Sequence, residues 1–259
     1  TMESVQKGGY EHFMLKEIHE QAKVAGDLIH MLDNSTDIAP MIERLNNANN
    51  LYLIACGTSY HASLLGSLYF GQLAQRSTIP VLAPQFAPQY GPAIGPDDVG
   101  IFVSQSGETK DVLNAVEVAQ THDMGILSLV NVIGSTLIRQ SEYHLPLTCG
   151  YEISVPATKT FSNQVLAFLA LTMRMGGHDT APLANLPLWI DQTLEAVEEQ
   201  IALLVEHLTP WDDLYCLGYG STYPIALEGA LKLKEITYAH CEGMLSTEFK
   251  HGPLAAVTE

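Results

Sequence analysis

The 259-residue sequence is poor in basic side chains: 12 Lys and Arg stand against 29 Asp and Glu, for a formal net charge of −17. A negative field of this size repels nucleic acids and anionic membrane surfaces, so neither is expected as a partner. It also disfavours phosphorylated ligands unless N–H, hydroxyl and Lys donors gather locally. The longest apolar run, residues 165–173, is much shorter than the roughly 20 residues of a membrane span. We expect it to form a buried core helix.

Cysteine is also scarce. Cys56, Cys149, Cys216 and Cys241 form no C-x-x-C pair and no zinc-type spacing, so we predict free, buried thiols in a reducing compartment. The ten histidines show no two-histidine helical spacing beside an acid, so no metal or organic cofactor is expected. The first residues lack a hydrophobic signal segment, and we therefore expect a cytoplasmic protein.

The sequence does contain a regular alternation of strand and helix patterns. We expect strands at residues 51–55, 79–82, 99–104, 125–130 and 144–147, and helices at residues 10–31, 38–48, 59–74, 110–122 and 161–175. Such alternation with short connections predicts an α/β fold, a doubly wound parallel sheet with helices on both faces. A further helix, residues 187–207, is expected to bridge two units.

A second pattern is an internal repeat. ACGTSYHAS at residues 55–63 aligns with GYGSTYPIA at residues 218–226, and in both copies an apolar strand ends in glycine and hydroxyl residues before a helix. We therefore predict a linker and N-terminal helix (residues 1–35), one complete unit (36–205) and the opening of a second (206–259). Such an incomplete unit is expected to leave apolar surface uncovered.

The segment VSQSGETKD, residues 103–111, takes the chain from a strand through a polar loop into a helix. Backbone N–H groups at a helix start are unpaired and lie at the positive end of the helix dipole, which suits a phosphate. Ser104, Ser106 and Thr109 add hydroxyls, and Gln105 adds an amide. The alternative interpretation is a polar turn that only caps the helix.

Charged residues concentrate in the segment 226–256. Lys232 and Glu235 are three apart on an expected helix and share a face, and His251 follows in the turn KHGP. A surface ion-pair chain of Glu228, Lys232 and Glu235 is the alternative. A carboxylate, an ammonium and an imidazole together suit proton transfer beside a carbonyl: Glu as base, Lys stabilising an enolate-like intermediate and His opening a sugar ring.

Four motifs, CGTSYHA, SQSGETKD, SVPATKTF and ALEGALKLKEITYAHCEG with EFKHGPLA, resemble in this order the glutamine–fructose-6-phosphate aminotransferase family, the glucosamine-6-phosphate synthases. The resemblance is to the isomerase half, which consists of two sugar isomerase (SIS) domains. It implies an enzyme of amino-sugar biosynthesis, an aminotransferase and ketose–aldose isomerase that converts fructose 6-phosphate and glutamine-derived ammonia to glucosamine 6-phosphate. It also implies a sugar-phosphate ligand (fructose 6-phosphate or glucosamine 6-phosphate), a homodimer and a linked glutaminase domain before residues 8–21.

By the same resemblance, Glu235 is the base between C1 and C2 of the imine, Lys232 stabilises the intermediate, and His251 assists ring opening, often from a neighbouring subunit. The implied substrate-binding residues belong to the other three motifs: Thr58, Ser59, Ser104, Gln105, Ser106, Thr109 and Val155.

Two departures from the family affect the expected activity. The chain begins with Thr1 rather than a nucleophilic cysteine, and it stops before the family's C-terminal lysine tail. We therefore expect a partial sugar-phosphate cleft with little or no turnover. Two alternatives stay open: an SIS-type sugar-phosphate deglycase or deaminase, and a non-catalytic sugar-phosphate sensor, which needs the 104–109 loop but neither Glu235 nor His251.

Overall fold

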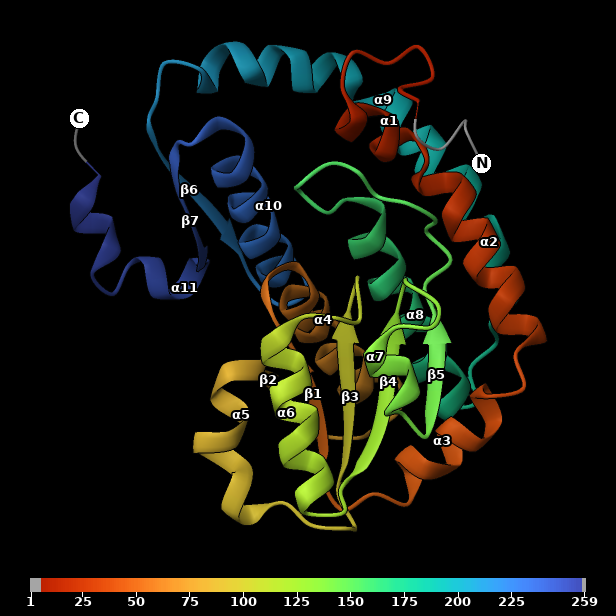
Figure 1. Ribbon diagram of the computed structural model, residues 1–259. Coiled ribbons are helices and arrows are strands. Elements are labelled where there is room, and N and C mark those ends of the chain that lie inside the picture. The colour runs from red at the N-terminus through yellow and green to blue at the C-terminus, as the bar shows by residue number, and fades with distance from the viewer. Residues whose placement is uncertain (1–5, 258–259) are drawn as a thin grey trace.

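The computed structural model describes residues 6–257 and contains two parallel sheets (Figure 1). The larger sheet has five strands in the order β2-β1-β3-β4-β5, and the smaller sheet pairs β6 with β7. The strands are β1 (Leu51–Ala55), β2 (Ile79–Leu82), β3 (Val99–Ser104), β4 (Gly125–Val130), β5 (Tyr143–Pro146), β6 (Asp213–Gly218) and β7 (His240–Leu245). The predicted parallel α/β fold is confirmed. Residues 1–5 of the expected linker and 258–259 of the expected second unit lie outside the described residues.

Helices alternate with these strands, as the sequence predicts. They are α1 (Phe13–His19), α2 (Gln21–Asn34), α3 (Ile38–Asn46), α4 (Gly57–Leu73), α5 (Ala83–Tyr90), α6 (Lys110–Thr121), α7 (Thr136–Arg139), α8 (Lys159–Met175), α9 (Leu186–Leu208), α10 (Thr222–Thr237) and α11 (Ser246–Phe249). The helix expected at 10–31 is instead two helices divided at Glu20. Four elements, α5, α7, β7 and α11, were not predicted from the sequence.

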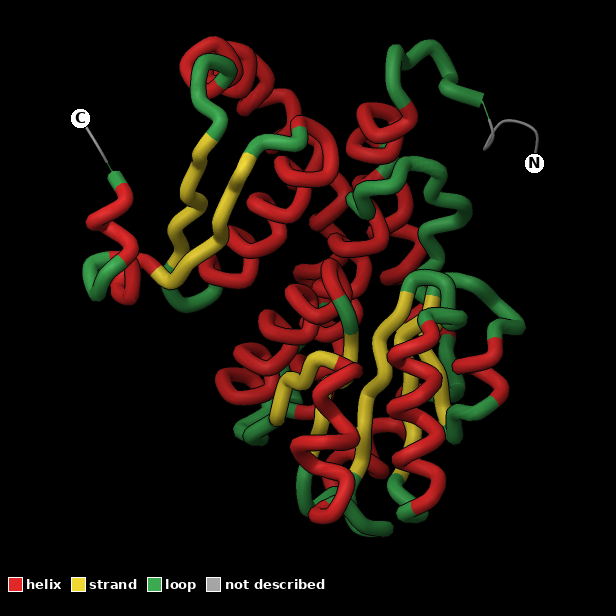
Figure 2. The backbone as a smooth tube through the Cα atoms, turned by 60° about the vertical axis from the view of Figure 1, so that its left-hand side comes forward, coloured by secondary structure: helices red, strands yellow, loops and turns green. Residues whose placement is uncertain are grey.

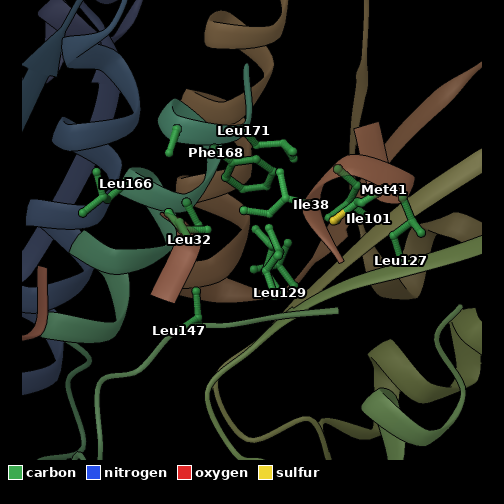
Figure 3. Packing of buried hydrophobic residues seen from close by; sticks show 14 of the residues in the cluster. Leu32, Ile38, Met41, Ile101, Leu127, Leu129, Leu147, Leu166, Phe168 and Leu171 are labelled. Atoms are coloured by element: carbon green, nitrogen blue, oxygen red, sulfur yellow. The ribbon is translucent and has the colours of Figure 1, made fainter. Parts of the chain in front are cut away.

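Strand residues alternate between two cores, one on each face of the large sheet. Leu51 and Leu53 of β1 belong to the core formed with α2, α3, α4 and α8. Tyr52 and Ile54 belong to the core formed with α5 and α6. Figure 3 shows Phe168 of α8, which is completely buried, packed among the leucines of the first core. Both faces of the sheet are therefore covered, and the expected core helix at 165–173 is confirmed within α8.

The strand order creates a switch point at the carboxyl ends of β1 and β3. The chain leaves β1 toward β2 on one side and later returns to β3 on the other side of β1. In open α/β sheets, ligands bind in the crevice at such a switch point. The loops after β1 and β3, which carry the CGTSYHA and SQSGETKD motifs, therefore lie side by side.

The smaller unit consists of β6, α10 and β7, and α10 packs against α4 of the larger unit. Figure 2 shows the two-stranded sheet set apart from the larger sheet, with helices between them. Its apolar side chains remain open to solvent: Leu217 is 44% exposed, Tyr219 68% and Leu254 52%. α9 connects the smaller unit to the preceding helices along the chain and packs against α2.

Candidate functional site

The loop after β3 is held in shape by its own hydroxyl groups. Ser104, which is 2% exposed, accepts the Gly107 N–H at 2.9 Å and lies 3.0 Å from the Thr109 hydroxyl. Ser106 Oγ accepts the Glu108 N–H at 3.1 Å. These bonds curl the backbone into a tight turn between the strand and the helix.

Gly107 is required at the tightest point of this loop. Its φ of +67° lies in the left-handed region, where a Cβ is strained. A Cβ at this position would lie 2.5 Å from Ser135 Cβ and 2.9 Å from Val130 Cγ1. The loop therefore follows a path that only glycine allows.

The start of α6 offers backbone donors to an anion. Leu113 N–H makes the first helical bond, to Thr109 O, so the N–H groups of residues 110–112 precede the helical ladder at the positive end of the dipole. Thr109 is the N-cap residue, yet its hydroxyl meets Ser104 rather than the helix backbone. This geometry favours the anion-site interpretation over a simple cap.

The loop after β1 lies beside this helix start. Burial, and secondarily the negative charge of Asp111 on α6, raises the pKa of the Cys56 thiol. Ser59, in the first turn of α4, accepts a bond from Gln164 Nε2 at 2.9 Å and is 8% exposed. Ser59 and Ser104 thus use part of their hydrogen-bonding capacity inside the protein, whereas Ser106 lies at the more open part of the loop.

Where α4 meets α10, a cluster of charged residues is largely buried. Lys232 Nζ lies 2.6 Å from Glu235 Oε2 and 3.3 Å from Glu228 Oε1, and it also donates to Thr58 Oγ1 at 3.1 Å. The Thr58 hydroxyl donates to Glu228 Oε1 at 2.9 Å. Glu228 is only 5% exposed. The predicted Lys232–Glu235 pair is therefore no surface ion pair, because it faces the CGTSYHA helix inside the interface.

His61 completes this cluster, and the sequence interpretation missed it. Its Nδ1 lies 2.7 Å from Glu228 Oε2, and its side chain is 15% exposed. The available signal was the spacing, since His61 follows Thr58 by three residues and residues so spaced share a helix face.

Val155 and Glu235 line one groove of about 560 Å³, together with apolar residues of α1. The loop that carries Val155 is fixed to α1 by Glu17, which is 2% exposed. The Glu17 carboxylate accepts the N–H groups of Ile153 at 2.5 Å and Ser154 at 3.2 Å, and it also accepts the Ser154 hydroxyl. The N-terminal helix therefore forms one wall of the candidate site.

The structure does not bring His251 to this cluster within one chain. It follows α11, beyond the ends of β6 and β7, whereas Glu235 lies in the last turn of α10 (Figure 1). Because α10 connects two parallel strands, it runs opposite to them, and Glu235 lies near the start of β7. The six residues of β7 alone span ~20 Å.

Among residues 6–257, no group of three or more His, Cys, Asp or Glu is arranged to hold a metal ion. Burial raises the pKa of Cys149 and of Cys241 to about 12, so both thiols stay protonated at neutral pH and are poor ligands and nucleophiles. None of the helices in this range has the length and apolarity needed to cross a membrane.

The chain is similar in sequence and in fold to known proteins. The SIS domain family profile matches residues 44–174 and 207–259. Glutamine–fructose-6-phosphate aminotransferases [isomerizing] of Methanothermobacter thermautotrophicus and Aquifex aeolicus are each 40% identical over 99% of this chain, which spans 43% of their length. The chain thus covers less than half of these relatives.

Solved structures show the same architecture. The C-terminal domain of glucosamine-fructose-6-phosphate aminotransferase from Francisella tularensis superposes with a TM-score of 0.84 at 29% identity, covering 97% of this chain and 74% of that one. Tagatose-6-phosphate ketose/aldose isomerase from Escherichia coli shares the fold, with a TM-score of 0.79 at 17% identity over 95% of this chain and 70% of that one. The profile match covers well over half of the sequence, and the chain therefore belongs to the SIS domain family.

Proposed function

We propose that this chain is the isomerase part of an enzyme that converts fructose 6-phosphate and glutamine-derived ammonia to glucosamine 6-phosphate. The observation that carries the proposal is the partly buried Lys232–Glu235 pair, 2.6 Å apart, with Lys232 also bonded to Thr58 after β1. This pair sits close to the switch point where the loop at 104–109 offers an anion site. The 40% identity to aminotransferases of that name supports the same substrate class.

In this proposal the substrate phosphate lies on the loop between β3 and α6. The N–H groups at the start of α6 supply the donors, together with Ser106, Thr109 and Gln105. Ser104 and Ser59 hold the two loops in place through their hydrogen bonds within the protein. Thr58 and Val155 line the sugar. An anion here gains several short hydrogen bonds and the helix dipole, which offset the repulsion of a strongly acidic protein.

Proton transfer is assigned to Glu235, which moves a proton between C1 and C2 of the imine. Lys232 then faces the oxygen on which negative charge develops. The Lys232 side chain is 15% exposed and that of Glu235 28%, so their interactions with a bound sugar are screened less than on an open surface. The close contact of the two groups before substrate binds keeps the ammonium fixed in place.

Ring opening is assigned to His251 of a second copy, since within one chain the length of β7 lies between the end of α10, which carries Glu235, and the segment that carries His251. The proposed assembly is therefore a homodimer in which each cleft takes one histidine from its neighbour. The proposal also includes a glutaminase domain linked ahead of α1, a boundary between SIS units near residue 205 and a cytoplasmic location. A sensor would have no use for three charged residues clustered where α4 meets α10, which favours an enzyme.

Isothermal titration with fructose 6-phosphate, glucose 6-phosphate and unphosphorylated fructose tests the proposal. We expect binding of the phosphorylated sugars and none of fructose. Ser106→Ala removes one hydrogen bond to a charged group and should weaken binding about 10-fold or more. Ser77→Ala, at an exposed serine outside the site, is the matched control and should bind like the parent. Equal binding of fructose and fructose 6-phosphate would contradict the proposal.

A further inference from the structure

His61 carries a largely shielded imidazole to which the mechanism above gives no role. It lies on α4, three residues after Thr58, and its Nδ1 is 2.7 Å from Glu228 Oε2. The side chains of His61 and Glu228 are 15% and 7% exposed. Two titratable groups so close and so shielded from water need a specific hydrogen-bond arrangement.

The chemistry of the pair decides that arrangement. Glu228 lies 3.3 Å from the Lys232 ammonium and accepts the Thr58 hydroxyl, both of which favour the ionised carboxylate. An ionised carboxylate can only accept hydrogen bonds, so the proton of the His61–Glu228 contact belongs to Nδ1. His61 is therefore the donor.

The two oxygens of Glu228 face different partners. Oε2 accepts the hydrogen bond from His61, whereas Oε1 accepts the Thr58 hydroxyl and forms the ion pair with the Lys232 ammonium. Holding Oε2 fixes the carboxylate plane and thus the direction of Oε1. Without that donor, both oxygens of Glu228 are free to turn to Lys232 and compete with Glu235 for its ammonium.

We propose that His61 is a positioning residue of the isomerase site. Its hydrogen bond to Glu228 Oε2 fixes the carboxylate, which in turn sets the orientation of Thr58 and Lys232 toward the sugar. The inference rests on the proposed function for its ligand. The hydrogen-bond chain itself, His61 to Glu228 to Thr58 and Lys232, is independent of that ligand. Sugar binding and the environment of the Lys232 ammonium can therefore be measured separately.

The first measurement is fructose 6-phosphate affinity in folded His61 variants. His61→Asn keeps an N–H donor near the position of Nδ1 and should bind within about twofold of the parent, whereas His61→Phe loses the donor and should bind about 10-fold more weakly, a range seen within one hydrogen-bond network. In a Lys232→Met background the His61→Phe loss should be smaller, because only Thr58 is then left to position. His30→Phe, at an exposed histidine, is the control.

A loss equally large in the Lys232→Met background, or equal losses in the Asn and Phe variants, overturns the inference, because His61 would then support only the packing of α4.

The second measurement needs no sugar. In protein with ¹³Cε-labelled lysine, the Lys232 resonance should shift in His61→Phe and return to its parental position in His61→Asn, while ¹⁵N spectra of the parent should show a protonated Nδ1 at His61. If the parent fails to bind fructose 6-phosphate, the proposed function is wrong. The positioning role is overturned if the Lys232 resonance is the same in the parent and in His61→Phe.

Discussion

Gly107→Ala tests the loop on which the phosphate assignment depends. Two separate costs follow from the structure. The φ of +67° places the new Cβ in the left-handed region, which costs ~1–2 kcal/mol for a residue other than glycine. The same Cβ would meet Ser135 Cβ at 2.5 Å and Val130 Cγ1 at 2.9 Å, and overpacking of this kind costs ~1–3 kcal/mol.

The two costs together predict that Gly107→Ala lowers the free energy of unfolding by about 2–5 kcal/mol. Denaturant unfolding followed by far-UV circular dichroism measures this change. Gly71→Ala is the matched control: Gly71 lies on the exposed side of α4 with open space at its Cβ, so alanine should stabilise by ~0.5–1 kcal/mol. A Gly107→Ala variant as stable as the parent, with the control behaving as expected, would refute the described loop.

Three further predictions concern buried groups. The pKa of Cys149 is raised from 9.0 to about 12 in the folded protein, so the thiol of the unfolded chain ionises at lower pH and the free energy of unfolding should fall as pH rises from 9 toward 12. Urea unfolding measured at several pH values checks this, and the fall should be smaller in Cys149→Ala. Phe168→Ala should cost ~3–5 kcal/mol by the same unfolding assay, because Phe168 is fully buried, and a loss below 1 kcal/mol would contradict the packing. Glu20→Gln removes the carboxylate 2.6 Å from the buried Lys159 ammonium and should lower the thermal midpoint, with a stability loss of ~3 kcal/mol, whereas Glu198→Gln on the exposed side of α9 should not.

The strands of the large sheet could be predicted because they are short apolar runs between turn residues. β7 could not, because Gly243 interrupts its pattern. Gly243 is explained only by the tertiary structure: a Cβ there would lie 2.6 Å from Leu227 Cα, so α10 packs directly on the strand. α5 was missed because Pro84 and Pro88 are typical of turns, yet Pro84 falls in its first turn, where proline is tolerated.

In the candidate site, too, some features could be predicted from local sequence and others could not. Lys232 and Glu235 could be paired from helical spacing, and the loop at 104–109 from its glycine and hydroxyl residues. The burial of Glu228 and its contact with His61 could not be predicted, because the two residues are 167 positions apart. Spacing within one helix carries no information about which helix packs against it. The position of His251, at the far end of β7, likewise depends on strand direction rather than on local sequence.

Phosphate binding and proton transfer are assigned to different parts of one cleft. Calorimetric titration of fructose 6-phosphate into the parent, Ser106→Ala and Glu235→Gln separates the two parts. We predict that Ser106→Ala loses about 10-fold or more in affinity, while Glu235→Gln, which keeps the size and polarity of the side chain, retains binding within a few-fold. Undiminished binding in Ser106→Ala, or equal losses in both variants, would contradict the account.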